Sequence, residues 1–283
     1  MAQREGSILC PSCRKLIHSS EPSCPYCGAV APGLVRAPRS LDALIGPNAD
    51  TSAWLVGACA GMYLLSLVLD PSAVMRSLQN FSLYTAFAPS TAMLYTLGMT
   101  GGVAIIFGGW WTVLTSSFLH ASLVHVAFEL MWTRSLGQMV STWFGPARLL
   151  VIWFVSGAVG HLLYNLLSDQ PIVGSDANIC GLLGALLAFG RRSGGSFGAD
   201  LLKRMTVITA IFLGLPLLFG ASLNTADLGG LVAGAVMGAV MPLADQARET
   251  RVVQLTALAF IGLTVLGFIA SAVRLGPMML GGP

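Results

Sequence analysis

Four ionisable residues lie in apolar stretches of this chain, where charge is costly. His125 and Glu129 stand four positions apart in the apolar run 119–137, and in a helix they would share one face, because residues i and i+4 lie one above the other. Asp176 and Asp227 each lie in a further apolar segment. Ionisable groups inside membrane-length helices usually face a bundle interior and mark a working site. We therefore expect these four residues to form the functional core, where carboxylates and imidazole can share protons or hold a cation.

Four cysteines near the N-terminus form a second chemical site. Cys10 and Cys13 make one CxxC pair, and Cys24 and Cys27 make another. Two such turns can present four thiolates to one tetrahedral Zn(II) ion. The alternative is a pair of disulfides, which a cytosolic location would disfavour. The spacing predicts a double zinc knuckle over residues 1–30, and a zinc with no open position predicts docking of a cytosolic protein partner rather than catalysis.

Composition indicates which elements must position these groups. The 283 residues are 55% hydrophobic and 10% charged, with a mean hydropathy of +0.76. Such a chain is too apolar for a soluble domain and is typical of an integral membrane protein in a lipid bilayer. Nothing in the composition suggests nucleic-acid binding.

Seven apolar stretches are long enough, with their flanks, for transmembrane helices. They cover residues 54–69, 117–136, 149–167, 173–189, 202–219, 226–241 and 252–273. We interpret 31–51 as a linker, 52–243 as a six-helix membrane core and 244–283 as a seventh transmembrane helix and tail. Pro71, Pro89 and several glycines interrupt residues 70–109, which predicts a long, partly embedded loop.

The basic residues predict the orientation of these helices. Cytoplasmic segments carry an excess of lysine and arginine. An inside N-terminus would place on the cytoplasmic side Arg134, Arg148, Arg191, Arg192, Lys203, Arg204, Arg248 and Arg251. Only Arg76 and Arg274 would lie outside. We therefore expect the inner (plasma) membrane of a bacterium, with a cytoplasmic N-terminus and an outside C-terminus.

Three motifs together resemble the rhomboid intramembrane serine proteases. The first leads into the second predicted span of a rhomboid-like six-helix bundle, and the other two lie on the fourth and sixth. The first is Trp110, Trp111 and Thr112 followed by His120 and His125; the second is the run from Gly174 to Ala177 followed by Gly181 and Gly184; the third is Asp227 followed by Gly230, Gly234 and Gly238. The small residues of the last motif, spaced by four, predict close packing of the sixth helix on the fourth.

The resemblance also implies where the catalytic groups should stand. The family places a serine nucleophile on the fourth helix, a histidine base on the sixth, and a histidine and an asparagine on the second that help to hold the oxyanion. By position, the nucleophile becomes Asp176, the base Asp227 and the asparagine Glu129, while His125 matches.

These exchanges argue against rhomboid-type proteolysis. A serine–histidine dyad needs an imidazole that takes and returns a proton, and an anionic Glu129 would repel a developing oxyanion. Ser175 stands one residue early, about 100° round a helix, and no histidine replaces Asp227.

Three functional hypotheses follow. The first is a pseudoprotease that binds transmembrane segments of client proteins or acts as a scaffold. The second is a metal or proton site formed by His125, Glu129, Asp176 and Asp227, which would support metal-assisted hydrolysis. The third is an intramembrane protease that uses Asp176 and Asp227 as a proton-sharing pair. A structural alternative is that the two aspartates cap helix starts, although this would not explain Glu129.

Overall fold

The computed structural model describes residues 7–10, 15–18, 21, 23–26, 45, 49–79, 82, 85–218, 223–247 and 249–274. The chain divides into two units, residues 1–49 and residues 50–283. Each unit is described by itself.

The first unit contains a small β-hairpin. Strand β1 (Ser7–Leu9) pairs antiparallel with strand β2 (Leu16–His18). Cys10 and Cys24 are buried together with Ile17 of β2. Cys13 and Cys27 lie outside the described residues, so the zinc site stays a prediction.

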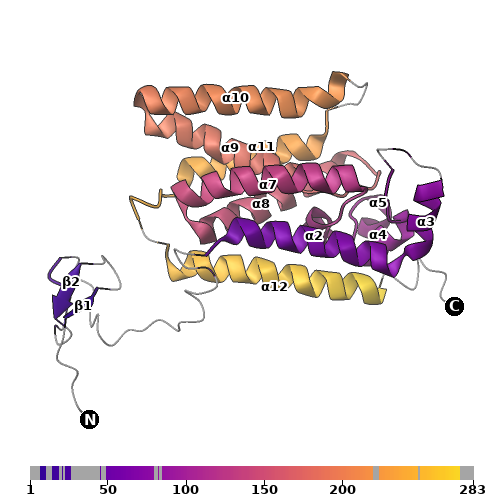
Figure 1. Ribbon diagram of the computed structural model, residues 1–283, viewed down its shortest axis with the longest axis horizontal. Coiled ribbons are helices and arrows are strands. Elements are labelled where there is room, and N and C mark those ends of the chain that lie inside the picture. The colour runs from indigo at the N-terminus through magenta and orange to yellow at the C-terminus, as the bar shows by residue number, and fades with distance from the viewer. Residues whose placement is uncertain are drawn as a thin grey trace, which may run out of the picture. The chain divides into compact units, whose positions relative to one another are not determined.

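The second unit is helical, and each of the seven predicted spans contains one long helix (Figure 1). These helices are α2 (Thr51–Leu69), α7 (Leu123–Phe144), α8 (Pro146–Leu167), α9 (Asp176–Ser193), α10 (Gly195–Leu218), α11 (Thr225–Val240) and α12 (Arg251–Arg274). Helix α10 lies on one side of this unit and α12 on the opposite side, with α7, α8, α9 and α11 between them (Figure 1).

Length and composition make three of the described helices able to cross a membrane: α2, α8 and α12. A fourth span would join the short helices α6 (Thr112–Thr115) and η1 (Ser116–Phe118) to α7, across a bend of 97°. The predicted second span, which began at residue 117, is therefore broken, and its long straight part begins at Leu123. These apolar helices are those of an integral membrane protein.

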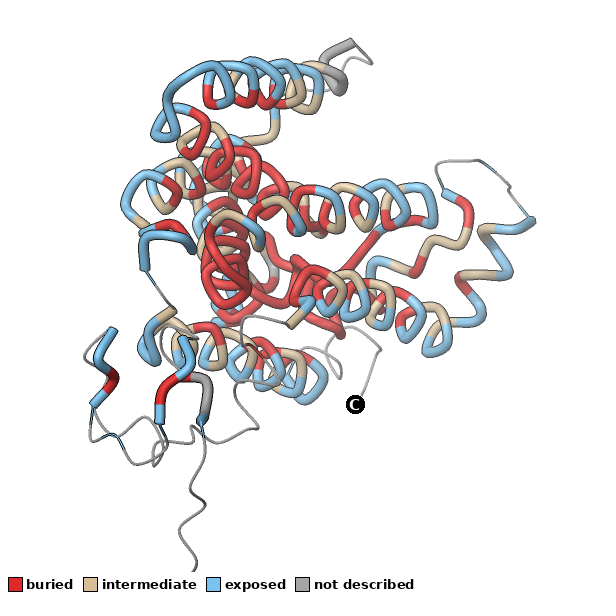
Figure 2. Tube along the Cα trace, turned by 60° about the vertical axis from the view of Figure 1, so that its left-hand side comes forward, coloured by how far each residue is buried: buried red, intermediate tan, exposed pale blue. Residues whose placement is uncertain are grey.

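Glycines let α11 approach α9 closely. A Cβ atom on Gly230 would meet the carbonyl oxygen of Ala177, and one on Gly234 would meet that of Gly181. A Cβ atom on Gly238 would lie 2.7 Å from the Cα atom of Ala185. The buried residues concentrate where α8, α9 and α11 meet, whereas α12 and α10 are largely exposed (Figure 2). Small residues permit this backbone contact without large side chains between the helices.

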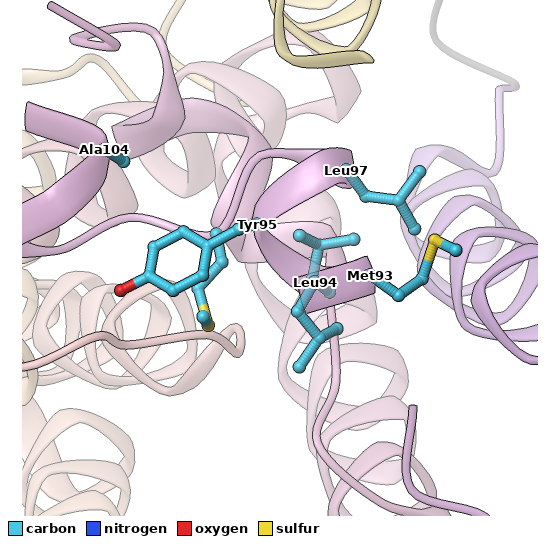
Figure 3. Packing of buried hydrophobic residues seen from close by; sticks show 7 residues of the cluster. Met93, Leu94, Tyr95, Leu97 and Ala104 are labelled. Carbon is cyan, nitrogen blue, oxygen red and sulfur yellow. The ribbon is translucent and has the colours of Figure 1, made fainter. Parts of the chain in front are cut away.

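The segment predicted as a loop, 70–109, contains short helices: α3 (Pro71–Gln79), α4 (Thr91–Leu97) and α5 (Gly102–Ile106). Side chains of α4 pack with Met99, Ala104 and Leu119 into a buried cluster (Figure 3). The indole N–H of Trp111 donates to Ser271 of α12 at 2.8 Å. The last helix therefore supports the segment that precedes α7.

Candidate functional site

The bend before α7 gathers the first residues of the site. Ser122 caps this helix, because its Oγ accepts the backbone N–H of His125 at 3.3 Å. His120 precedes the cap, His125 lies in the first turn and Glu129 lies one turn further on. The rings of His120 and His125 are 5.7 Å apart, so both imidazoles reach the same carboxylate.

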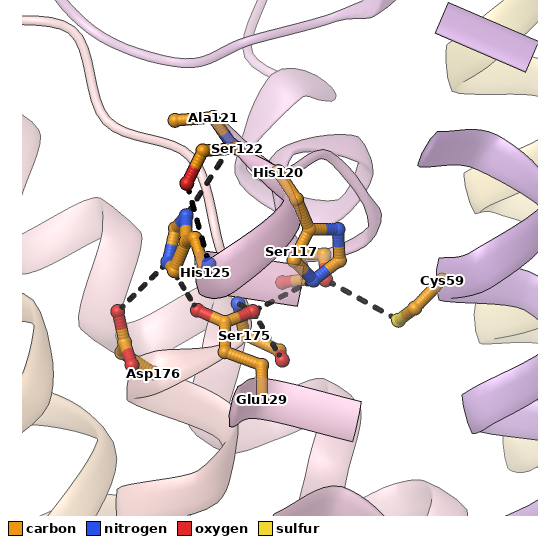
Figure 4. A network of polar contacts seen from close by, with 9 residues as sticks. All are labelled: Cys59, Ser117, His120, Ala121, Ser122, His125, Glu129, Ser175 and Asp176. Atoms are coloured by element: carbon orange, nitrogen blue, oxygen red, sulfur yellow. Dashed lines mark hydrogen bonds and ion pairs between the residues drawn. The ribbon is translucent and has the colours of Figure 1, made fainter. Parts of the chain in front are cut away.

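Glu129 is the centre of the site (Figure 4). Its side chain is fully buried, and its Oε2 atom accepts the backbone N–H of Ser175 at 2.7 Å and the Ser175 hydroxyl at 2.8 Å. Nε2 of His120 lies 2.7 Å from Oε2, and Nε2 of His125 lies 2.7 Å from Oε1. One carboxylate thus joins α7 to the start of α9.

Gly174 allows the Glu129 carboxylate to lie close to the backbone before α9. Its φ angle is +121°, a conformation that glycine adopts without a steric penalty. A Cβ atom here would lie 2.6 Å from Oε1 of Glu129 and 3.0 Å from Nε2 of His125. Gly174 also ends the non-helical approach to α9, so this helix begins at Asp176 rather than at residue 173 as expected. Ser175 stands at the N-cap position, with its hydroxyl turned to Glu129.

One nitrogen of His125, Nε2, lies close to two carboxyl groups, those of Glu129 and Asp176. Its Nδ1 atom accepts the backbone N–H of Ala121 at 3.3 Å, so in the neutral ring the proton lies on Nε2. Nε2 is 2.7 Å from Glu129 and 3.5 Å from Oδ2 of Asp176. The side chains of His125 and Asp176 are 26% and 32% exposed, which leaves this side of the site accessible.

Asp227 lies apart from this group. It is buried in the first turn of α11, close enough to Asp176 and Glu129 for their charges to act on it. Its Oδ1 atom has no hydrogen-bond partner among the described residues, so this oxygen shares no proton with Asp176.

The helix-capping explanation of Asp227 is wrong. Asn224 caps α11 by accepting the backbone N–H of Ala226 at 3.0 Å. Asp227 therefore does not occupy the N-cap of α11, although it lies in the first turn of this helix.

Two residues of the site were not singled out from the sequence. His120 is part of the first rhomboid-like motif, yet its contact with Glu129 depends on the bend before α7. Ser175 was considered only as a nucleophile, whereas it anchors a carboxylate. The proximity of these side chains arises from tertiary structure, and helical spacing could not have revealed it.

The arrangement does not provide a serine–histidine dyad at the family's positions. Ser175 donates its hydroxyl to a carboxylate rather than to an imidazole. Elsewhere, the buried Ser116 has its Oγ 3.1 Å from Nδ1 of His161. That nitrogen also lies 3.0 Å from the carbonyl oxygen of Val113, so it carries the proton and cannot accept one from Ser116.

A divalent cation could be held by three of the predicted residues. His125, Glu129 and Asp176 each offer one ligand atom, and these atoms lie within 4.8 Å of one another. Asp227, predicted as a fourth ligand, is not part of this group.

Comparison with known proteins agrees with the fold. Residues 107–244 match the family model described as the rhomboid domain. The chain is 30% identical over 154 residues to "Rhomboid protease GluP" of Bacillus subtilis, a match that covers 54% of this chain and 30% of that protein. It is 28% identical over 169 residues to "RHOMBOID-like protein 4" of Arabidopsis thaliana, covering 58% of this chain and 43% of the relative.

A third relative is "Inactive RHOMBOID-like protein 8" of Arabidopsis thaliana, which is 33% identical over 114 residues. That match covers 40% of this chain and 32% of the relative. In each of these three comparisons the chain spans less than half of the relative's length. The matched region holds α7 to α11 and every residue of the site described above. Residues 107–244 are therefore similar to a rhomboid domain, and the apolar helices of the chain are those of an integral membrane protein.

Proposed function

We propose that this protein has no rhomboid-type proteolytic activity and binds transmembrane segments of client proteins. The observation that carries the proposal is the anchoring of Glu129 by Ser175 and by two histidines. The donors at the start of α9 are taken up by a carboxylate of the chain itself. In an active site of this type, such donors must be free for the oxyanion of the substrate.

Charge supports the same conclusion. Asp176 and Asp227 stand where the resemblance places the nucleophile and the base, and an aspartate is a weak base at neutral pH. Their neighbour Glu129 adds a third carboxyl group. Together these groups oppose negative charge on a bound carbonyl oxygen, so the site disfavours acyl transfer.

The acids suit a client with a basic or polar residue near the outer end of its transmembrane segment. Oδ1 of Asp227 is a buried acceptor with no partner among the described residues, and Asp176 is partly exposed. Basic groups inside membranes pair with acids, because an unpaired charge is costly there. A lysine or arginine of a client would satisfy Asp227.

We assign the N-terminal cysteines Cys10, Cys13, Cys24 and Cys27 to one structural Zn(II) ion that docks a cytosolic partner. Burial of Cys10 and Cys24 beside the hairpin supports this assignment. We also propose the plasma membrane of a bacterium, with the N-terminus in the cytoplasm. Purified protein should contain one zinc per chain that is lost in a Cys13→Ser, Cys27→Ser variant. Unchanged zinc in that variant would contradict the assignment.

Proteolysis and client binding can be separated with the full chain. We expect no cleavage of a model transmembrane substrate and no adduct with a fluorophosphonate inhibitor. Cleavage that disappears in Asp176→Asn and in Asp227→Asn would instead support an aspartyl protease.

Client binding is tested by a photo-crosslinking residue at Val232, which is 64% exposed on α11. Crosslinks to membrane proteins should form in the wild type and decrease in Asp227→Asn. Asp200→Asn serves as the matched control, because Asp200 pairs with Arg204 on the exposed face of α10. Equal crosslinking in both variants would remove Asp227 from client recognition.

A further inference from the structure

We propose that His125, Glu129 and Asp176 bind a divalent transition-metal ion. This inference does not rest on the proposed client binding, which is tested separately at Asp227. The ligand atoms come from the first two turns of α7 and from the first residue of α9. Nε2 of His125 lies between Oε1 of Glu129 at 2.7 Å and Oδ2 of Asp176 at 3.5 Å, so a small ion could contact all three residues.

The surroundings of the Oε1 atom of Glu129 support a bound metal ion. Glu129 is completely buried, and Oε2 receives both donors of Ser175. Among the described residues, the close polar neighbour of Oε1 is Nε2 of His125, which lies 2.7 Å away without the alignment of a hydrogen bond. A buried carboxylate oxygen with this single, poorly aligned contact is incompletely satisfied, and a bound ion is one of the few groups that can satisfy it.

The charge of the group also calls for a cation. Among the described residues, the basic groups within 4 Å of Glu129 and Asp176 are the imidazoles of His120 and His125. When His120 and His125 are neutral, the carboxylates of Glu129 and Asp176 carry two negative charges, which one divalent ion would balance. A single nitrogen and two oxygen donors suit Zn(II) or Mn(II).

The surroundings resemble those of a metal centre with open positions. Ser175 and His120 contact Oε2, the oxygen of Glu129 that would not bind the metal. Such contacts commonly orient the side chains that bind a metal ion. A Cβ atom at Gly174 would lie 2.6 Å from Oε1 and 3.0 Å from Nε2, so a glycine here is what lets the two ligand atoms keep their positions. Because His125 and Asp176 are partly exposed, water could complete the coordination, as in sites that keep an open position.

Metal binding would change one contact of His125. A metal on Nε2 requires the ring proton on Nδ1, which now accepts the N–H of Ala121 at 3.3 Å. That bond is long, and the ring is partly exposed, so Nδ1–H would donate to water instead. Loss of the contact with Ala121 lowers the affinity for the metal ion but does not prevent its binding.

The test uses the purified full chain after chelator treatment. Mn(II) is the probe, because carboxylates suit it and thiolates do not, so the N-terminal cysteines do not interfere. Electron paramagnetic resonance of free Mn(II) should report one ion bound per chain in the wild type. Glu129→Gln and Asp176→Asn should each weaken this binding more than about 10-fold, since they remove a ligand.

The controls separate this site from general charge. Asp200→Asn, which changes an exposed acid paired with Arg204 on α10, should bind Mn(II) as the wild type does. Co(II) added to a chain with all four N-terminal cysteines changed to serine should give a spectrum without thiolate charge-transfer bands. If Glu129→Gln does not fold, the partly exposed Asp176 still provides the decisive variant. The proposal is overturned if the wild type does not bind Mn(II), or if Asp176→Asn binds it with unchanged affinity.

Discussion

Ser175 holds Glu129 twice, through its backbone N–H and through its hydroxyl, on the same carboxylate oxygen at 2.7 and 2.8 Å. The two residues lie 46 positions apart, on the cap of α9 and in the second turn of α7. Hydrogen bonds to a buried charged group are among the stronger ones in proteins. This contact therefore fixes how α7 and the start of α9 meet.

Removal of the Ser175 hydroxyl should destabilise the protein. Ser175→Ala loses one hydrogen bond to a buried carboxylate, which should lower the free energy of unfolding by about 1.5–3 kcal/mol. Ser193→Ala is the control, because its Oγ donates to Phe189 within the same helix at an exposed position. Unfolding of the detergent-solubilised proteins would measure both effects. Equal losses in the two variants would show that the Glu129 contact has no special weight.

Glycine at position 234 should be required for the packing of α11 on α9. In Gly234→Ala the added Cβ atom would collide with the carbonyl oxygen of Gly181, and overpacking of this kind costs about 1–3 kcal/mol or more. Gly262→Ala in α12 is the matched control, because a Cβ atom there meets nothing within 4 Å. Thermal unfolding should show a loss for the first variant and none for the second. A neutral Gly234→Ala would mean that the two helices pack less closely than described.

Restoring the family's catalytic residues should require three changes. We expect no cleavage of a model transmembrane substrate by Asp176→Ser, Asp227→His, because the carboxylate of Glu129 still repels an oxyanion. Addition of Glu129→Asn removes this charge and should permit some cleavage. Cleavage assays and labelling by a fluorophosphonate would follow both proteins. Activity of the double variant would show that Glu129 does not prevent catalysis.

The junction before α2 should become less stable in acid. The Arg134 guanidinium donates to Asp50 at 2.6 Å and, together with Ser52, holds the pKa of this carboxyl well below its ordinary value of 3.8. Because the pKa is lower in the folded state, the contact stabilises the protein above the ordinary pKa and loses this effect as the pH falls toward the folded value. Both side chains are more than one third exposed, so the effect should be small.

Asp50→Asn tests this dependence without removing the helix cap, since asparagine also caps well. Melting temperatures of the two proteins should differ at neutral pH and begin to converge only below the ordinary pKa of 3.8, as the pH falls toward the lower pKa of the folded state. Arg134→Gln should behave in the same way, and the double variant should add little. A constant difference across the acidic range would contradict the role of ionised Asp50.

The sequence was informative where a pattern lies within one helix. Apolar stretches predicted the positions of the seven long helices, and the four-residue spacing predicted that His125 and Glu129 would meet. The rhomboid-like motifs fall within the region that the family comparison matches. Each of these features depends on helical geometry or on a resemblance over many residues.

The rest depends on contacts that no local pattern contains. The bend of 97° before α7 brings His120 to Glu129, and the positive φ of Gly174 sets where α9 begins. Asp227 was expected beside the other three residues, yet it lies outside the group of close ligand atoms. Sequence spacing cannot fix the relative rotation and depth of separate helices, and these decide which carboxylates converge.

The separation of Glu129 and Ser175 in the sequence also affects how the chain is inserted into the membrane during its synthesis. If helices enter the bilayer in the order of their synthesis, α7 inserts before α8 and the start of α9 have left the ribosome. During that interval Glu129 has only the two neighbouring histidines of its own segment as partners. On this order of insertion, the two imidazoles are the groups beside which this acid would enter the lipid, because they lie 2.7 Å from its oxygens and belong to the same stretch of chain.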